Sequence, residues 1–138
     1  MKKLLGCFDL KADISLLLNP LPEGLITYNN FACTIACNQA FTEEFRIILA
    51  GNIFNSQSLV RQFSLKASGT AEIALNLFIL KGSDWISYVD GDFTAIIFNH
   101  KELYIFRDRH GSGPQIYFTN KYFASLMPDL LKYRDFIP

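Results

Sequence analysis

Three cysteines, Cys7, Cys33 and Cys37, are the side chains of this chain best suited to nucleophilic chemistry. A cysteine attacks a carbonyl carbon as its thiolate, so a nearby base or a free α-amine must take its proton. Cys33 and Cys37 lie in the run FACTIAC, which is typical of a strand. Four residues along a strand span about 13 Å, which is too far for a disulfide or a shared metal ion. We therefore expect buried thiols.

The histidines and aspartates show no spacing that indicates a catalytic base or a metal site. His110 lies in an Arg-His-Gly turn with no nucleophile motif beside it, and His100 lies in a predicted hairpin turn. The aspartates at positions 90 and 92 are a whole hairpin away from Asp108. The Gly-Ser-Gly at 111–113 lacks the strand–loop–helix context of a phosphate loop. We predict neither a metal nor a cofactor.

Residues 90–123, DGDFTAIIFNHKELYIFRDRHGSGPQIYFTNKYF, combine apolar strands with a turn rich in Arg, Asp, Gly and Pro. This stretch resembles the end of the N-terminal glutaminase domain of asparagine synthetase, whose pattern is D-G-x-F, then R-D-x-x-G-x-x-P, then F-A-S. The matching turn residues are Arg107, Asp108, Gly111 and Pro114. We interpret this turn as structural, because glycine permits backbone angles that other residues avoid and proline pre-sets a bend.

The resemblance puts the family's N-terminal nucleophile on a lysine. The family opens Met-Cys-Gly-Ile-x-Gly, and a match through Gly6, Phe8 and Asp9 places its cysteine at Lys2. A protonated lysine has no lone pair with which to attack, and the methionine before such a long side chain is rarely removed. Processing that makes Cys7 a new N-terminal nucleophile is the alternative, although the family's glycine does not follow Cys7.

The remaining site positions implied by the resemblance are also altered. The family's Asn-Gly-Glu-Ile-Tyr-Asn forms the oxyanion hole and corresponds to residues 50–55, so Ala50 lacks the side-chain donor while Gly51 keeps the backbone donor. The family's Ser-Asp-Thr-Glu holds the substrate amino group and becomes Ser-Gly-Thr-Ala, so the clamp carboxylate is absent at Gly69. Gly51 and Asn52 would line what remains of the pocket. The strand context of Arg46 does not match the family's carboxylate-binding arginine, so that role is not assigned to it.

The resemblance therefore implies a class II glutaminase-like domain without glutaminase activity. Such domains occur in β-lactam synthetases and lasso-peptide cyclases, which need no ammonia from glutamine. By resemblance, the chain is an accessory part of an ATP-dependent amide-forming system, in peptide or natural-product biosynthesis. Its partner would be an asparagine-synthetase-like synthetase domain or protein. Two alternatives stay open: a stand-alone module that binds a small molecule or peptide, and an active glutamine amidotransferase.

Hydrophobic periodicity predicts the elements that position these residues. A helix capped by Asn55 or Ser56 is expected to carry Leu59, Val60 and Phe63 on one side. A second helix over 70–81 has so little polar face that it should be covered on nearly all sides, and a short helix follows at 84–88. Apolar runs predict strands at 4–8, 25–28, 31–37, 45–49, 93–98, 103–106, 116–118 and 122–125.

The order of these elements predicts an α+β fold. Strands at 93–98 and 103–106 are apolar on both faces, which is typical of a sheet covered on both sides. Strands before and after a helical pair then favour two sheets with helices outside. This arrangement agrees with the four-layer αββα sandwich of N-terminal-nucleophile hydrolases that the resemblance implies, here in a shortened form.

Length and composition indicate one compact domain over residues 1–138, with half of its residues hydrophobic. The net charge is zero and no basic cluster occurs, which argues against nucleic acid or an anionic membrane as partner. The apolar stretch between the lysines and Gly6-Cys7 consists of Leu4 and Leu5 alone, too few for a signal peptide, so we expect a cytoplasmic protein. The high apolar content makes a homodimer or a docked synthetase a further expectation.

Overall fold

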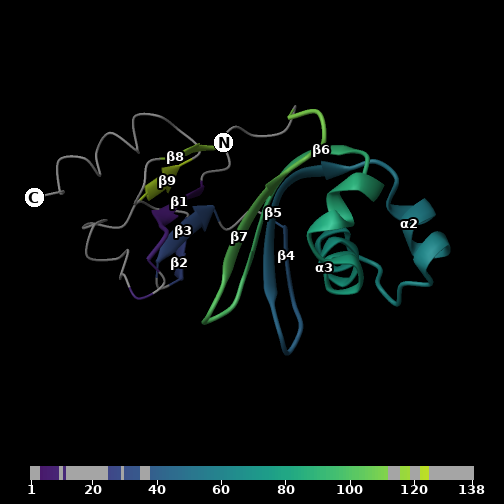
Figure 1. Cartoon of the computed structure of the whole chain (residues 1–138), viewed down its shortest axis with the longest axis horizontal. Helices are drawn as coiled ribbons and strands as arrows, with labels where there is room; N and C mark the ends of the chain where they lie inside the picture. The colour runs from purple at the N-terminus through teal and green to yellow at the C-terminus, as the bar shows by residue number, and fades with distance from the viewer. Residues whose placement is uncertain are drawn as a thin grey trace, which may run out of the picture. The chain divides into compact units, whose positions relative to one another are not determined.

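The computed structural model describes residues 4–9, 11, 25–28, 30–34, 38–111, 116–118 and 122–124 (Figure 1). The chain divides into two compact units, one of residues 1–37 with 115–138 and one of residues 38–114. Each unit contains one antiparallel sheet. The α+β class is therefore confirmed, while the single domain over 1–138 stays a prediction.

The first unit is a five-stranded sheet in the order β2-β3-β1-β9-β8. Its central strand is β1, which pairs with β3 on one side and β9 on the other. The predicted hairpin is confirmed by the pairing of Tyr28 with Phe31. The strands are β1 (Leu4–Cys7), β2 (Leu25–Tyr28), β3 (Phe31–Thr34), β8 (Tyr117–Phe118) and β9 (Tyr122–Ala124).

Close packing around Gly6 fixes the centre of this sheet. A Cβ at Gly6 would lie 2.3 Å from Cβ of Phe31 and 2.6 Å from Cζ of Phe123. Both phenylalanines are fully buried. The glycine therefore allows two aromatic rings to pack where a side chain would collide with them.

The second unit is a four-stranded sheet in the order β4-β5-β6-β7, with its helices on one side (Figure 1). Trp85, Phe93 and Phe78 are buried between this sheet and the helices. The elements are β4 (Asn38–Phe41), β5 (Arg46–Ile53), α2 (Ser56–Phe63), α3 (Thr70–Lys81), the 3-10 helix η1 (Gly82–Tyr88), β6 (Gly91–Phe98) and β7 (Leu103–Arg107).

Strands β5 and β6 have apolar side chains on both faces, which explains why they lie in the middle of the sheet. Ile47 and Leu49 pack in the core beneath the helices. Ile48 and Ile96, which pair with each other and point to the opposite face, are also fully buried. The prediction of burial on both faces is therefore confirmed for β6, whereas β7, for which the same was predicted, is only partly buried along its length.

The structure corrects two sequence-based expectations and adds one strand that was not predicted. Asn55 precedes α2 but makes no side-chain cap; its amide instead donates to the carbonyl of Tyr88 and accepts from the amide of Asp90, at 2.9 and 3.0 Å. Helix α3 is not covered on nearly all sides, because Ile79 and Leu80 are 42% and 55% exposed. Strand β4 was not predicted, since Asn-Gln-Ala-Phe is too short and polar to give an apolar pattern.

The helices of the described residues are all too short or too polar to cross a bilayer.

Candidate functional site

The turn after β7 is held by hydrogen bonds from its own Arg and Asp. The carboxylate of buried Asp108 accepts the amide N–H of Phe93 at 3.1 Å, and the Asp108 amide donates to the Phe93 carbonyl at 3.1 Å. Nη2 of Arg107 donates to the carbonyl of Gly111 at 2.6 Å. Gly111 has a φ of +64°, which favours glycine. These contacts join β6 to the turn, and Pro114 lies outside the described residues.

Replacing Asp108 by alanine should lower the free energy of unfolding by about 2 to 3 kcal/mol, because the buried Phe93 amide loses a charged acceptor. Asp108→Asn keeps an oxygen acceptor and is expected to cost about half as much. Urea titrations followed by far-ultraviolet circular dichroism measure both values. Equal stability of Asp108→Ala and the parent chain would contradict this role.

Ala50 and Gly51, which the resemblance aligns with the oxyanion hole, lie near the end of β5. Gly51 has a φ of +118°, and a Cβ there would lie 2.1 Å from the carbonyl oxygen of Asp92. Ala50 is 1% exposed and pairs with Thr94 of β6. Asn52 is exposed and pairs with Asp92. The positive φ and the close approach of the Asp92 backbone therefore explain why position 51 is a glycine. Ala50 contributes only a buried methyl group.

Gly69 lies immediately before α3, at its N-cap. Its φ of −89° and ψ of 151° are open to any residue, and its carbonyl accepts the amide N–H of Ile73 at 2.9 Å. Gly69 is exposed, and nothing lies within 4 Å of where its Cβ would be. The position could hold the family's aspartate without strain, yet it carries no side chain.

A groove of about 680 Å³ runs between β4 and the first half of α3, and we call it the β4–α3 groove. Gly69 lies in its wall, whereas neither Ala50 nor Gly51 is among its described lining residues. The lining residues are Asn38, Gln39, Ala40, Phe41, Thr42, Arg46, Lys66, Gly69, Thr70, Ala71, Glu72, Leu75 and Asn76.

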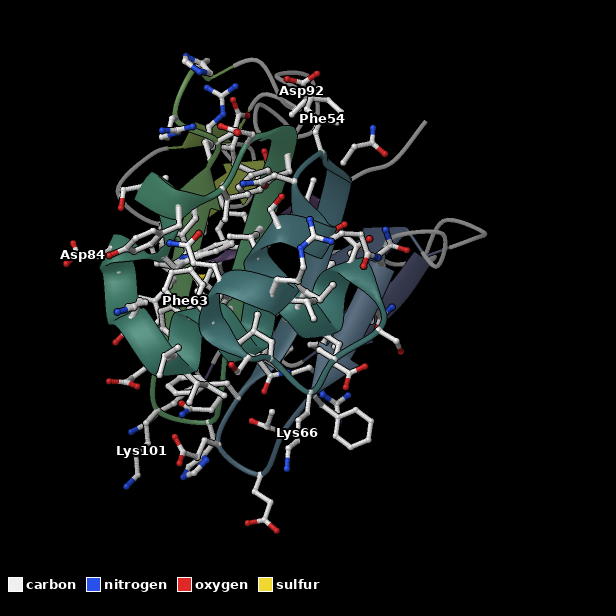
Figure 2. The ribbon with its side chains drawn as sticks, turned by 90° about the vertical axis from the view of Figure 1, so that its right-hand side faces the viewer. Phe54, Phe63, Lys66, Asp84, Asp92 and Lys101 are labelled. Atoms are coloured by element: carbon white, nitrogen blue, oxygen red, sulfur yellow. The ribbon has the colours of Figure 1, made fainter. Side chains whose placement is uncertain are left out.

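Two basic side chains line this groove, Arg46 from the start of β5 and Lys66 from the loop before α3. The guanidinium carbon of Arg46 lies 5.6 Å from the centre of the Phe41 ring. In Figure 2, Lys66 lies at the lower end of this unit, and Phe54 and Asp92 lie at the upper end. The groove and the Gly51 segment are thus at different ends of β5. Sequence reasoning missed the groove because its two walls come from separate parts of the chain.

Among the described residues, the other candidate side chains do not form a reactive cluster. Cys7 is buried in β1; its amide donates to the Asn30 carbonyl at 2.6 Å, and its carbonyl accepts from Nδ2 of Asn30 at 2.8 Å. His100 and His110 are exposed. Lys2 and Cys37 lie outside the described residues. Within the part of the chain that the structure describes, no three His, Cys, Asp or Glu side chains come together as metal ligands would.

Comparisons with known proteins give a family and a fold. A family model described as a glutamine amidotransferase domain matches residues 34–138. No curated protein matches the chain. Among the solved structures that match is a glutamine phosphoribosylpyrophosphate amidotransferase from B. subtilis in complex with ADP and GMP, with 14% identity and a TM-score of 0.54.

This match covers 90% of the present chain and 35% of the B. subtilis chain, so the present chain spans about a third of that protein. At this level of identity the likeness concerns the fold alone. It confirms the prediction that the fold is similar to that of N-terminal-nucleophile hydrolases.

Proposed function

The chain belongs to the glutamine amidotransferase domain family, and from that premise we propose that it is a member without glutaminase activity. Its role would be that of an accessory domain in an ATP-dependent, asparagine-synthetase-like system that forms amide bonds. The observation that carries this proposal is the pair of positions Ala50 and Gly69, where the structure offers a buried methyl group and an empty N-cap.

Hydrolysis of glutamine by a class II glutaminase needs a nucleophile, two donors to the oxyanion and a polar clamp on the substrate. Loss of one oxyanion donor raises the barrier by about 3 to 4 kcal/mol. Ala50 cannot supply that donor, and Gly69 cannot supply the clamp carboxylate. Even with an intact nucleophile, the two losses together would leave little rate enhancement.

Cys7 is a poor replacement for the missing nucleophile. Its nitrogen is an amide inside the central strand of a sheet, hydrogen-bonded to Asn30, and the residue as a whole is only 8% exposed. A free α-amine at Cys7 would require the removal of Leu4, Leu5 and Gly6, which pair with β3 and β9. Activation by processing would therefore dismantle the sheet that holds the cysteine.

A stand-alone binding module is the second candidate function, and the β4–α3 groove favours it. The groove volume of about 680 Å³ is in the range of ligand sites. Two basic side chains and one acidic side chain line it. A lone gene and a tightly retained ligand would support this function, whereas a neighbouring synthetase gene and co-elution with its product would support the accessory role.

The test of inactivity is release of glutamate from glutamine by the purified chain, measured with a sensitive coupled assay. We expect no release above the level of buffer, and the same result for Cys7→Ala. Glutamate release that disappears in Cys7→Ala would overturn the proposal and identify an active amidotransferase. Glutamate release that persists in Cys7→Ala would also overturn the proposal, because a nucleophile other than Cys7 would then be at work.

A further inference from the structure

Lys66 and Glu72 carry opposite charges and line the same β4–α3 groove, but they do not pair with each other. Lys66 lies in the loop before α3 and Glu72 lies in the first turn of α3, and both residues are exposed. Within the described part of the chain, neither the Lys66 ammonium nor the Glu72 carboxylate has an ion pair or a hydrogen bond. Two such charges in one groove are complementary to a ligand that carries one charge of each sign.

Neutral polar side chains line the groove beside these charges. The Asn76 amide donates to the carbonyl of Glu72 at 2.8 Å, and its side-chain oxygen accepts no hydrogen bond from a described residue. The Thr70 hydroxyl also has no partner among the described residues. Groups of this kind can bond the N–H and C=O of a peptide unit. Gln39 and Arg46 line the groove too, but they already have partners within the chain, so we assign them no role.

The size of the groove indicates how long such a ligand is. The groove has a volume of about 680 Å³, and all four residues of β4 line it. A strand of four residues is about 13 Å long, and three extended residues span at most about 11 Å. A tripeptide therefore fits along this wall and separates its ammonium from its carboxylate. A single amino acid is much shorter and would leave most of the groove to water.

We propose that the β4–α3 groove binds a short peptide with free ends, about three residues long. The peptide carboxylate lies next to Lys66, and the peptide ammonium lies next to Glu72. The amide groups between them contact Thr70 and Asn76, and a small apolar side chain contacts Leu75. This inference rests on the binding module given above as the second candidate function, and it names the class of ligand.

The probe is trialanine, titrated at neutral pH into the ¹⁵N-labelled full chain. Two counterparts each lack one charge, since acetyl-trialanine has no ammonium and trialanine amide has no carboxylate. We expect trialanine to shift the amide signals of 38–42 and 66–76, and each counterpart to bind about fivefold more weakly. Free glutamine also carries both charges, but it should bind about fivefold more weakly than trialanine because it fills less of the groove.

Two variants connect each charge of the peptide with one side chain. Lys66→Gln should weaken trialanine about fivefold but leave trialanine amide within about twofold, because the amide has no carboxylate to lose a partner. Glu72→Gln should likewise weaken trialanine and leave acetyl-trialanine within about twofold. Lys101→Gln is the control in the exposed β6–β7 turn and should leave every affinity within about twofold. Unchanged amide signals outside the groove verify that each variant is folded.

Three results would overturn the inference: no shift at about 10 mM trialanine, equal affinity for trialanine and either counterpart, or glutamine that binds as tightly as trialanine. Equal weakening of trialanine and its amide by Lys66→Gln would also overturn it, because Lys66 would then not contact the carboxylate. The assays for glutamate release and for co-elution with a synthetase contain no peptide. Failure of this inference and failure of the proposed function are therefore distinguishable.

Discussion

Gly51→Ala is expected to lower the free energy of unfolding by about 4 kcal/mol, or to leave no folded protein. The φ of +118° is strained for any residue with a Cβ, at a cost of about 1 to 3 kcal/mol. The added methyl would also lie 2.1 Å from the Asp92 carbonyl oxygen and 2.7 Å from Cα of Phe93, and backbone atoms cannot move aside as a flexible side chain can. Denaturant unfolding followed by circular dichroism and tryptophan fluorescence measures the loss.

Gly69→Ala is the matched control for this substitution. It adds the same methyl group at a position with open space and an ordinary φ of −89°, so the change should stay within about 1 kcal/mol. A similar small change for Gly51→Ala would show that the end of β5 can relax. The contrast bears on function, since a glycine required by the backbone is no sign of a working oxyanion hole.

The sequence predicted the elements with a strong hydrophobic pattern. Helix α3 occupies Thr70–Lys81 as expected, because its run of apolar residues ends at Gly82, where φ is +62°. Strand β6 was expected from Phe93 and lies within Gly91–Phe98, buried on both faces. Such patterns predict these elements correctly because burial of apolar side chains is the main force that forms them.

Features that depend on contacts between distant residues could not be predicted. Asn55 or Ser56 was expected to cap the helix, yet the side-chain amide of Asn55 is hydrogen-bonded to the backbone of Tyr88 and Asp90, more than thirty positions away. The β4–α3 groove combines an unpredicted strand with the start of a helix, and no sequence pattern indicates that these two segments lie side by side. Ala50 and Gly69 were predicted to be altered site positions only because a family resemblance supplied residues for comparison.

β1 has only four residues, but its central position makes it essential to the first sheet. β1 is the middle strand of β2-β3-β1-β9-β8, so every path across this sheet passes through it. Without β1, the sheet separates into the β2–β3 hairpin and the β8–β9 hairpin. Isolated two-stranded hairpins are only marginally stable in water. The packing of Phe31 and Phe123 around Gly6 would be lost as well.

A chain shortened to begin at Cys7 should therefore lose the first sheet altogether, although it has the free α-amine that a cysteine nucleophile needs. The expected result is the loss of the amide signals of β2, β3, β8 and β9 in a two-dimensional NMR spectrum, and no glutamate release. A chain that begins at Leu4 keeps β1 and is the control, with signals and stability close to those of the parent. A folded chain beginning at Cys7 that hydrolyses glutamine would contradict both the structural role of β1 and the proposed inactivity. A folded but inactive one would contradict the structural role alone, because Ala50 and Gly69 would still deny the substrate a donor and a clamp.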